Sequence, residues 1–161
     1  MKDADADVNA TAGVRSVHPP AWVMRWIVNP IVRTVAESPV GRRMSGIVVL
    51  RFDGWRSGRH YTIPAVAHQI DGEMVVFTDA RWAANFRGGR ALDVQQAGTR
   101  CSTTARLVED APTTAGLLRR VLETKKPSAL GLSIDGGYTP TDEELFSARH
   151  AIRLEHCASR T

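Results

Sequence analysis

Cysteine, lysine, aromatic residues and long uncharged apolar runs are all scarce in this sequence of 161 residues. Its two cysteines, Cys101 and Cys157, are too few for the disulfide framework of a small secreted protein. Residues 1–7 are rich in aspartate, whereas a signal peptide opens with a positive segment. Because Arg25 and Arg33 interrupt the most apolar stretch, no segment is apolar enough to span a membrane. We therefore expect a cytoplasmic protein, and peripheral membrane contact through an interfacial helix is compatible with these absences.

The positive charge of the chain lies in its middle. Residues 41–106 hold ten arginines against five acidic residues, whereas the remainder is close to neutral. Arginine supplies 18 of the 21 basic side chains, and its planar guanidinium suits phosphate and carboxylate groups. A general arginine bias in composition is the alternative explanation. Nucleic-acid binding is not expected, because aromatic residues make up only 6% of the chain and the arginines cluster in predicted turns.

The chain is predicted to form a disordered tail over residues 1–18 and a single domain over residues 19–161. The tail has almost no large apolar side chain, so burial would not offset the entropy lost on ordering it. Residues 21–35 carry apolar side chains at helical spacing, and Pro30 is expected to kink or restart that helix. With 43% hydrophobic residues, a chain of this length can bury one core without a metal or a disulfide.

Short segments with the β-branched or alternating pattern of strands fill much of the remainder. Asp71-Gly72 lies between two of them and predicts a tight hairpin, because both central residues of such a turn need positive φ. Gly98-Thr99 predicts a second hairpin in the same way. The predicted strands are 47–52, 59–70, 73–78, 91–97, 102–109 and 151–155; the predicted helical segments are 80–88, a helix from Pro112 and a capping-box helix over 141–146, with a loop over 131–140. The pattern indicates an α+β fold in which about six mainly antiparallel strands close into a small barrel with peripheral helices.

A glycine-rich turn joins the first two predicted strands, with the sequence Asp53-Gly54-Trp55-Arg56-Ser57-Gly58-Arg59. Backbone N–H groups in such a turn can approach an anion, and the two arginines add charge-assisted contacts. The turn therefore predicts a phosphate cradle, with a solvated hairpin turn as the alternative. It is not a P-loop, because no Lys-Ser or Lys-Thr pair follows the glycines and no helix begins there.

A second arginine-bearing connection, residues 78–90, follows the third predicted strand. A helix beginning there would place a partial positive charge beside Arg81, and Trp82 or Phe86 would be able to cover a planar ring. For either aromatic residue alone, burial in the core is the alternative. The two connections flank one hairpin, which favours a shared binding site.

Other catalytic and metal-binding patterns are absent from the sequence. The five histidines share no metal-ligand spacing with the cysteines, so no metal site is predicted. There is no G-x-G-x-x-G motif and no nucleophile elbow. Ser57 has no evident base in the sequence, so a Ser-His-Asp hydrolase is not expected.

Four motifs occur in order between residues 29 and 156. They are Asn29-Pro30 with Ser38-Pro39 and Gly41, the G-x-x-S-G turn at Gly54–Gly58, Pro64 in the next strand, and the W-x-x-N-F-R-G-G segment at Trp82–Gly89. In these motifs the chain resembles the deazaflavin-dependent nitroreductase family of actinobacteria. The fold of that family is a split β-barrel related to pyridoxamine-phosphate oxidases.

The resemblance implies binding of the reduced deazaflavin coenzyme F-420, with FMN a less suitable ligand. Residues that would meet the phosphate and acidic tail are Arg56, Ser57, Gly58 and Arg59. Residues that would lie along the ring are Thr62, Ile63 and Pro64, and those that would complete the pocket are Thr78, Arg81, Trp82, Asn85 and Arg87. Tyr61 departs from the family, in which many members carry arginine there, so one anion contact is lost.

The activity that the resemblance implies is hydride transfer from the reduced coenzyme to a quinone, nitroaromatic or enone acceptor. Tyr61, His60 and Tyr138 are the candidate proton donors if the reaction needs one. The predicted N-terminal helix would dock on the barrel, cap the substrate pocket or rest on a membrane surface. Because Tyr61 removes an anion contact, the alternative is a split barrel that binds FMN, haem or a fatty acid without catalysis. A homodimer is compatible with both functions.

Overall fold

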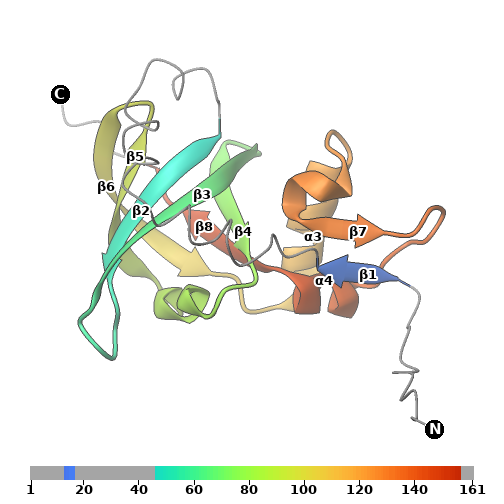
Figure 1. Cartoon of the computed structure of the whole chain (residues 1–161), viewed down its shortest axis with the longest axis horizontal. Helices are drawn as coiled ribbons and strands as arrows, with labels where there is room; N and C mark the ends of the chain where they lie inside the picture. Colours follow the sequence, from blue (N-terminus) through green and yellow to red (C-terminus); the bar gives the residue numbers. More distant parts are fainter. Residues whose placement is uncertain (1–12, 17–45, 157–161) are drawn as a thin grey trace, which may run out of the picture.

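Six strands form a closed barrel in a computed structural model that describes residues 13–16 and 46–156 (Figure 1). The barrel strands are β2 (Ile47–Asp53), β3 (His60–Ile70), β4 (Glu73–Thr78), β5 (Arg90–Gln96), β6 (Thr99–Leu107) and β8 (His150–Leu154). They follow the order β2-β3-β4-β8-β6-β5 around the barrel, and every neighbouring pair is antiparallel. Closure leaves the barrel no open sheet edge. The predicted α+β split-barrel class and the number of barrel strands are confirmed.

The two predicted hairpins are present, one of them shifted by a residue. Asp71 and Gly72 have φ values of 51° and 84°, as the turn between β3 and β4 requires. In the second hairpin the positive φ values fall on Ala97 and Gly98, at 48° and 82°. Thr99 instead starts β6 and pairs with Gln96. The prediction of Gly98-Thr99 as the turn is therefore wrong by one position, because β-branched threonine belongs in a strand more readily than at positive φ.

Two α-helices and two 3₁₀ helices complete the described elements. They are η2 (Arg81–Phe86), α3 (Ala111–Leu122), η3 (Pro127–Leu130) and α4 (Asp142–Ala148). Asp110 caps α3, because its carboxylate accepts a hydrogen bond of 2.8 Å from the Thr113 N–H. The predicted capping box of α4 is confirmed by reciprocal bonds between Thr141 and Glu144.

A short two-stranded sheet was not expected from the sequence. It pairs β1 (Val14–Ser16) with β7 (Leu132–Ile134). The prediction of a disordered tail is therefore wrong for Val14–Ser16, and the prediction of a loop over 131–140 is wrong for Leu132–Ile134. Pairing between segments so far apart in the sequence supplies hydrogen bonds that no local pattern reveals. The predicted helix over 21–35 and the rest of the predicted tail lie outside the described residues.

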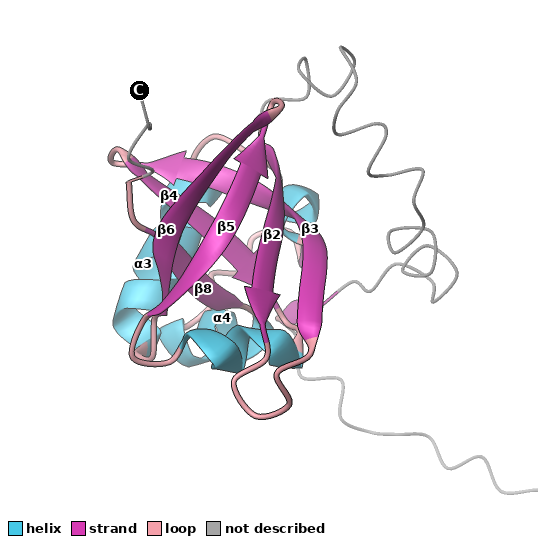
Figure 2. Cartoon of the chain, turned by 90° about the vertical axis from the view of Figure 1, so that its left-hand side faces the viewer, coloured by secondary structure: helices cyan, strands magenta, loops and turns pink. Residues whose placement is uncertain are grey.

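The core has two parts that share strands of the barrel. Inside the barrel lie side chains such as Val48, Leu50 and Ile152, each fully buried. A second cluster joins α3 and α4 to the outside of the barrel, where Val75 and Ala151 pack with Leu118. The alternation of side chains along β4 and β8 explains this sharing, since consecutive residues face opposite sides. The helices therefore cover one side of the barrel and leave the outer face of β6, β5, β2 and β3 uncovered by described helices (Figure 2).

The part of the chain that the structure describes contains neither a membrane-spanning helix nor a cluster of metal-binding side chains. Its helices are too short and too polar to cross a membrane. Its histidine, cysteine, aspartate and glutamate side chains form no group of three or more that would hold a metal ion.

Candidate functional site

The glycine-rich turn between β2 and β3 closes on itself through backbone hydrogen bonds. The Gly54 N–H donates to the Arg59 carbonyl and the Gly58 N–H to the Gly54 carbonyl, each at 2.8 Å. Position 54 favours glycine, because a Cβ there would lie 2.9 Å from Ser57 Oγ and 3.0 Å from Tyr61 Cε2, and both side chains would have to move. Gly58 adopts a φ of 64°, which an L side chain rarely takes. The sequence of the turn therefore fixes its shape.

This turn offers fewer N–H groups to an anion than its sequence suggests. Four of its N–H groups are occupied, because Trp55 donates to Asn85 and Arg59 to Ser57 Oγ in addition to the two bonds above. Within the described residues, the N–H groups of Arg56 and Ser57 donate to no other group. The Ser57 hydroxyl accepts from Arg59 N–H and keeps its own proton for donation. Two N–H groups and one hydroxyl thus face solvent beside the two arginines.

The arginines of the turn are exposed and have no acidic partner among the described residues. The Arg56 guanidinium lies 4.7 Å from the ring centre of Trp55, whose side chain is 57% exposed. Arg59 is also exposed. Arginine stacked on an indole keeps its N–H edge available for hydrogen bonds. The turn therefore carries two unpaired positive charges.

Asn85 joins the two connections that the sequence predicts to share a site. Its Oδ1 accepts a hydrogen bond of 3.0 Å from the Trp55 N–H, and its Nδ2 donates at 2.8 Å to the Trp82 carbonyl. The two connections are 30 residues apart at this contact. They lie at the same end of the barrel, the lower end in Figure 1. This hydrogen bond brings the two segments side by side.

The segment after β4 closes one end of the barrel. Phe86 is fully buried, and its ring centre lies 4.8 Å from that of Phe52. Trp82 is half-buried and lies 5.9 Å from Phe52, so both aromatic residues pack with the core. The segment is a 3₁₀ helix of six residues, which is too short to present a helix N-terminus to Arg81. The contribution of a helix dipole is therefore not found.

The remaining predicted residues of this segment lie at its two ends. Thr78 ends β4 and accepts a hydrogen bond of 3.1 Å from the Ala80 N–H. Arg81 is exposed and has no acidic partner within the described part of the chain. Arg87 is exposed but lies 3.5 Å from a carboxylate oxygen of Glu109. Arg81 is thus a third unpaired charge, whereas Arg87 is already paired.

The strand after the turn divides its predicted ligand-binding residues between two faces. Ile63 packs with the interior cluster of the barrel, whereas Thr62 and Pro64 project from the outer face because side chains alternate along a strand. The three residues therefore do not share one surface. Thr62 and Pro64 lie opposite Arg51 and Val49 of β2.

The three candidate proton donors occupy different places. Tyr61 faces the barrel interior and stacks on Phe52, with ring centres 5.2 Å apart. His60 is exposed and lies 2.8 Å from the Asp53 carboxylate. Tyr138 donates at 2.7 Å to Glu144, which raises its pKa, and its loop between β7 and α4 lies at the opposite end of the molecule (Figure 1). The structure therefore does not bring Tyr138 to the turn.

A row of polar side chains lies on the outer face of the barrel and was not predicted from the sequence. Arg51 on β2 donates at 2.6 Å to Gln95 on β5. Asp93 on β5 accepts from Ser102 at 2.6 Å and from Arg100, and these bonds lower its pKa. The strand register places this row beside Thr62. The sequence shows that polar residues alternate with apolar ones along β2, β5 and β6. Only the pairing order of these strands brings the polar residues into one row.

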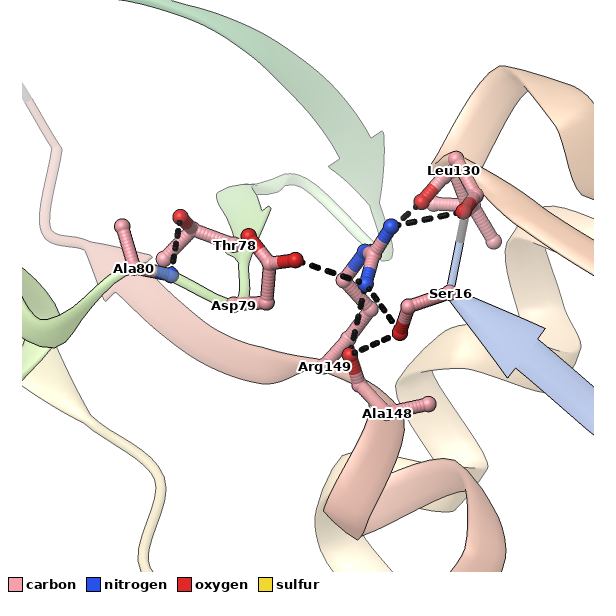
Figure 3. Close-up of polar contacts among 8 residues, drawn as sticks. Ser16, Thr78, Asp79, Ala80, Leu130, Ala148 and Arg149 are labelled. Atoms are coloured by element: carbon pink, nitrogen blue, oxygen red, sulfur yellow. Dashed lines mark hydrogen bonds and ion pairs between the residues drawn. The ribbon is translucent and has the colours of Figure 1, made fainter. Parts of the chain in front are cut away.

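A buried arginine, Arg149, was also not predicted from the sequence. Arg149 follows α4 and is 6% exposed. It donates at 2.9 Å to Ser16 Oγ of β1 and approaches Asp79 Oδ2, just after β4, at 3.4 Å (Figure 3). Its other bonds go to the carbonyls of Leu130, Gly131 and Ala148, at 2.9, 2.7 and 2.7 Å. Arg149 therefore connects β1, the approach to β7 and the segment that leads into η2.

Comparison with known proteins found solved structures of low similarity. No protein-family model matches the chain, and no curated protein matches it. A solved F-420-H2-dependent reductase, FDR-A, has 16% identity and a TM-score of 0.47 over 69% of this chain and 95% of its own. A structure described as a domain-swapped dimer has 15% identity and a TM-score of 0.47, covering 86% of this chain and all of its own. A protein named as a candidate for 5-nitroimidazole antibiotic resistance, from Bacteroides thetaiotaomicron, has 6% identity and a TM-score of 0.42 over 88% of this chain and 81% of its own. At these values the similarity assigns no function.

Proposed function

We propose that the protein is an oxidoreductase that binds the reduced deazaflavin coenzyme F-420 at the β2–β3 turn and passes a hydride to a quinone, nitroaromatic or enone. The observation that carries the proposal is the hydrogen bond of 3.0 Å between Trp55 N–H and Asn85 Oδ1. It holds together two arginine-bearing connections that are distant in sequence. Their motifs are those in which the chain resembles deazaflavin-dependent nitroreductases.

The residues present fit the anionic part of such a coenzyme. Arg56, Arg59 and Arg81 are exposed cations without an acidic partner among the described residues. Ser57 adds a hydroxyl donor beside them. Charge-assisted bonds from arginine to phosphate and carboxylate are among the stronger hydrogen bonds in proteins. These side chains would hold the phosphate and the acidic tail.

The residues near the turn also fit a planar ring, with a smaller set than the sequence analysis expected. Thr62 and Pro64 project from the outer face of β3 and would lie along the ring. Ile63 supports that strand from inside the barrel. Asn85 bonds the η2 segment to the turn, and Trp82 packs on Phe52 of β2; we expect these two side chains to limit access of water.

The coenzyme, when bound, supplies the hydride. The protein's part is to bind the anionic tail, orient the ring and keep water from the reacting face. His60 and Tyr61 are the candidate proton donors beside the turn, and the Asp53 carboxylate, 2.8 Å from His60 Nδ1, would orient the imidazole ring.

A second function is favoured by one observation. Tyr61 stacks on Phe52 and faces the barrel interior, so the anion contact that many relatives make from this position is replaced by packing. A barrel that binds FMN, haem or a fatty acid without catalysis would need fewer anion contacts at the turn. The two functions therefore differ in the charge of the ligand that they require.

The deciding experiment is a fluorescence titration of the purified full chain with oxidised F-420 and, separately, with FMN, at low and high salt. We expect saturable binding of the deazaflavin that weakens as salt increases, because exposed charges are screened. Arg56→Ala combined with Arg59→Ala should weaken binding by about ten-fold or more, as expected for the loss of two charge-assisted contacts. The matched control is Arg100→Ala, which removes an exposed arginine of β6 that pairs with Asp93.

Each outcome decides between the two functions. Equal losses in the turn variant and in Arg100→Ala would contradict the assignment of the turn. Binding of FMN, haem or a fatty acid that depends less on salt, without binding of F-420, would support the non-catalytic function. Binding of F-420 would then justify a screen of quinone, nitroaromatic and enone acceptors.

A further inference from the structure

Cys101 lies in β6 and is joined to another cysteine by a disulfide bond. The chain has two cysteines, so the partner is Cys157, which directly follows the described residues. The side chain of Cys101 is half-buried and packs against the interior cluster of the barrel. Neither cysteine belongs to the candidate site at the β2–β3 turn. The bond therefore ties β6 to the chain that follows β8.

The bond lies on the seam of the barrel at which β6 meets β8. β6 pairs with β5 along Thr99–Ala105, whereas its pairing with β8 covers Ala105–Leu107. Just past β8, two hydrogen bonds continue the contact. The Glu155 N–H donates to the Thr104 carbonyl at 2.9 Å, and the Thr103 hydroxyl donates to the Glu155 carbonyl at 2.7 Å. The seam with β8 is therefore the shorter of the two edges of β6, and the chain after β8 extends it.

The register of this seam agrees with a bond between the two cysteines. Ala105 lies opposite Leu154, and the pairing is antiparallel. Each step along the chain after Leu154 therefore meets a residue one step earlier in β6, as the bonds of Glu155 show. Two more steps would bring position 157 opposite Ser102, next to Cys101. Residues one position apart on neighbouring strands lie within the Cα separation that a disulfide bridges.

We propose that the bond between Cys101 and Cys157 is a reversible, redox-controlled clasp on the seam between β6 and β8. Breaking it removes no described strand pairing, because Cys157 lies beyond β8, so the reduced protein keeps its barrel. Forming it opposes separation of the strands at the shorter edge of β6 and restricts the unfolded chain. The inference does not depend on the function proposed for the β2–β3 turn.

The oxidant in this reaction is a low-molecular-weight disulfide. The thiolate of one cysteine attacks a sulfur atom of that disulfide, which forms a mixed disulfide and releases a small thiolate. The thiolate of the other cysteine then attacks the protein sulfur atom of the mixed disulfide, which forms the internal bond and releases the second small thiolate. The protons of both cysteine thiols pass to the released thiolates. The cysteines are oxidised and the small disulfide is reduced, and an excess of a small thiol reverses both steps.

The first test is peptide mapping by mass spectrometry of the full chain after incubation with oxidised glutathione or with dithiothreitol. We expect peptides joined through Cys101 and Cys157 after oxidation, and alkylation of both thiols after reduction. The far-UV circular dichroism spectrum should be the same in both states, because the strand pairing remains. Glutathione retained on the protein, or cross-linked dimers in place of the internal bond, would overturn the proposal.

The second test is native-state hydrogen exchange of the oxidised and reduced protein. After reduction, the amides of Ala105–Leu107 and Ile152–Leu154 should exchange faster by about ten-fold or more, and their change should exceed that of the β2 and β3 amides. Equal exchange in the two states would overturn the proposal. So would an equal change in all strands, because the bond would then act on overall stability and not on the seam.

Cys157→Ser is the deciding variant, because position 157 follows the last strand of the barrel and the substitution leaves the core intact. It should exchange like the reduced wild-type protein under both oxidising and reducing conditions. Ser159→Ala is the matched control, since it changes the same terminal segment and keeps both cysteines. It should respond to oxidation as the wild-type protein does. A response to oxidation that persists in Cys157→Ser, or that is lost in Ser159→Ala, would contradict the clasp.

Discussion

At the scale of single residues, two positions hold neighbouring segments in place. A Cβ at Gly54 would crowd Ser57 Oγ and Tyr61 Cε2, so glycine lets these two side chains pack against the turn. Arg149 is buried with five polar partners from four separate segments. Both residues act by holding others in place, the first within the turn and the second between β1, the approach to β7 and Asp79.

We predict that Gly54→Ala lowers the free energy of unfolding by about 1–3 kcal/mol, because the added methyl group displaces the Ser57 hydroxyl and the Tyr61 ring from their packed positions. It should also weaken coenzyme binding, since the turn carries Arg56 and Arg59. Urea denaturation measures the first effect. Gly116→Ala is the matched control, because a Cβ there meets nothing within 4 Å and α3 gains a better helix former. Equal stability of Gly54→Ala and wild type would contradict the close approach.

We predict that Arg149→Met lowers the free energy of unfolding by about 2–5 kcal/mol, because buried carbonyls and Asp79 lose their donor. Arg120→Met removes an arginine whose side chain is 53% exposed and, among the described residues, forms an ion pair with Asp71 alone, so it should cost under about 1 kcal/mol. Thermal or urea denaturation of the two variants tests the difference. Similar losses would mean that the network around Arg149 adds little.

At the scale of elements, caps and cross-strand bonds fix where segments begin and how they align. The capping box of α4 joins Thr141 and Glu144, and the Tyr138 hydroxyl donates to Glu144 at 2.7 Å. These bonds stabilise the carboxylate and lower the pKa of Glu144 below its ordinary value of 4.5. On β5, Asp93 is held in the same way by Ser102 and Arg100 of β6. Both elements therefore depend on ionised carboxylates.

We predict that the stability of the protein falls as the pH drops from about 5 to 3, in part through Glu144. A carboxyl group whose pKa is lower in the folded chain than in the unfolded one stabilises the fold above its unfolded pKa. That contribution disappears as the pH falls through the folded pKa. Glu144→Gln should therefore be less stable than wild type at pH 7 and should show a shallower loss in acid. Parallel curves for the two proteins, obtained by urea denaturation at several pH values, would contradict this role.

At the scale of the whole molecule, the two parts of the core share β4 and β8. Val75 and Val76 are neighbours in sequence, yet one packs with the helices and the other inside the barrel. Loss of the helix layer would expose one face of strands whose other face forms the barrel interior. The two parts should therefore unfold together.

We predict that Leu118→Ala, in the fully buried part of α3, costs about 2–5 kcal/mol and weakens the barrel equally. Native-state hydrogen exchange measures this directly, because amides of β2 and of α3 should lose the same amount of protection. If the β2 amides kept their protection, the helix layer would be a separate unit. A homodimer is compatible with the sequence, and sedimentation of the same samples tests whether it forms.

The sequence by itself determined the local geometry. Asp71-Gly72 predicts its hairpin because few residues tolerate positive φ, and Thr141 with Glu144 predicts the start of α4 because their reciprocal bonds are local. The alternating strands predict a barrel of about six strands because their inward side chains need a common core. Only the tertiary structure decided which distant groups meet. Pairing of β1 with β7, the bond from Trp55 to Asn85 and the burial of Arg149 each join segments far apart in the chain. Such contacts arise from the closure of the barrel and from packing against it, and no short pattern in the sequence encodes them.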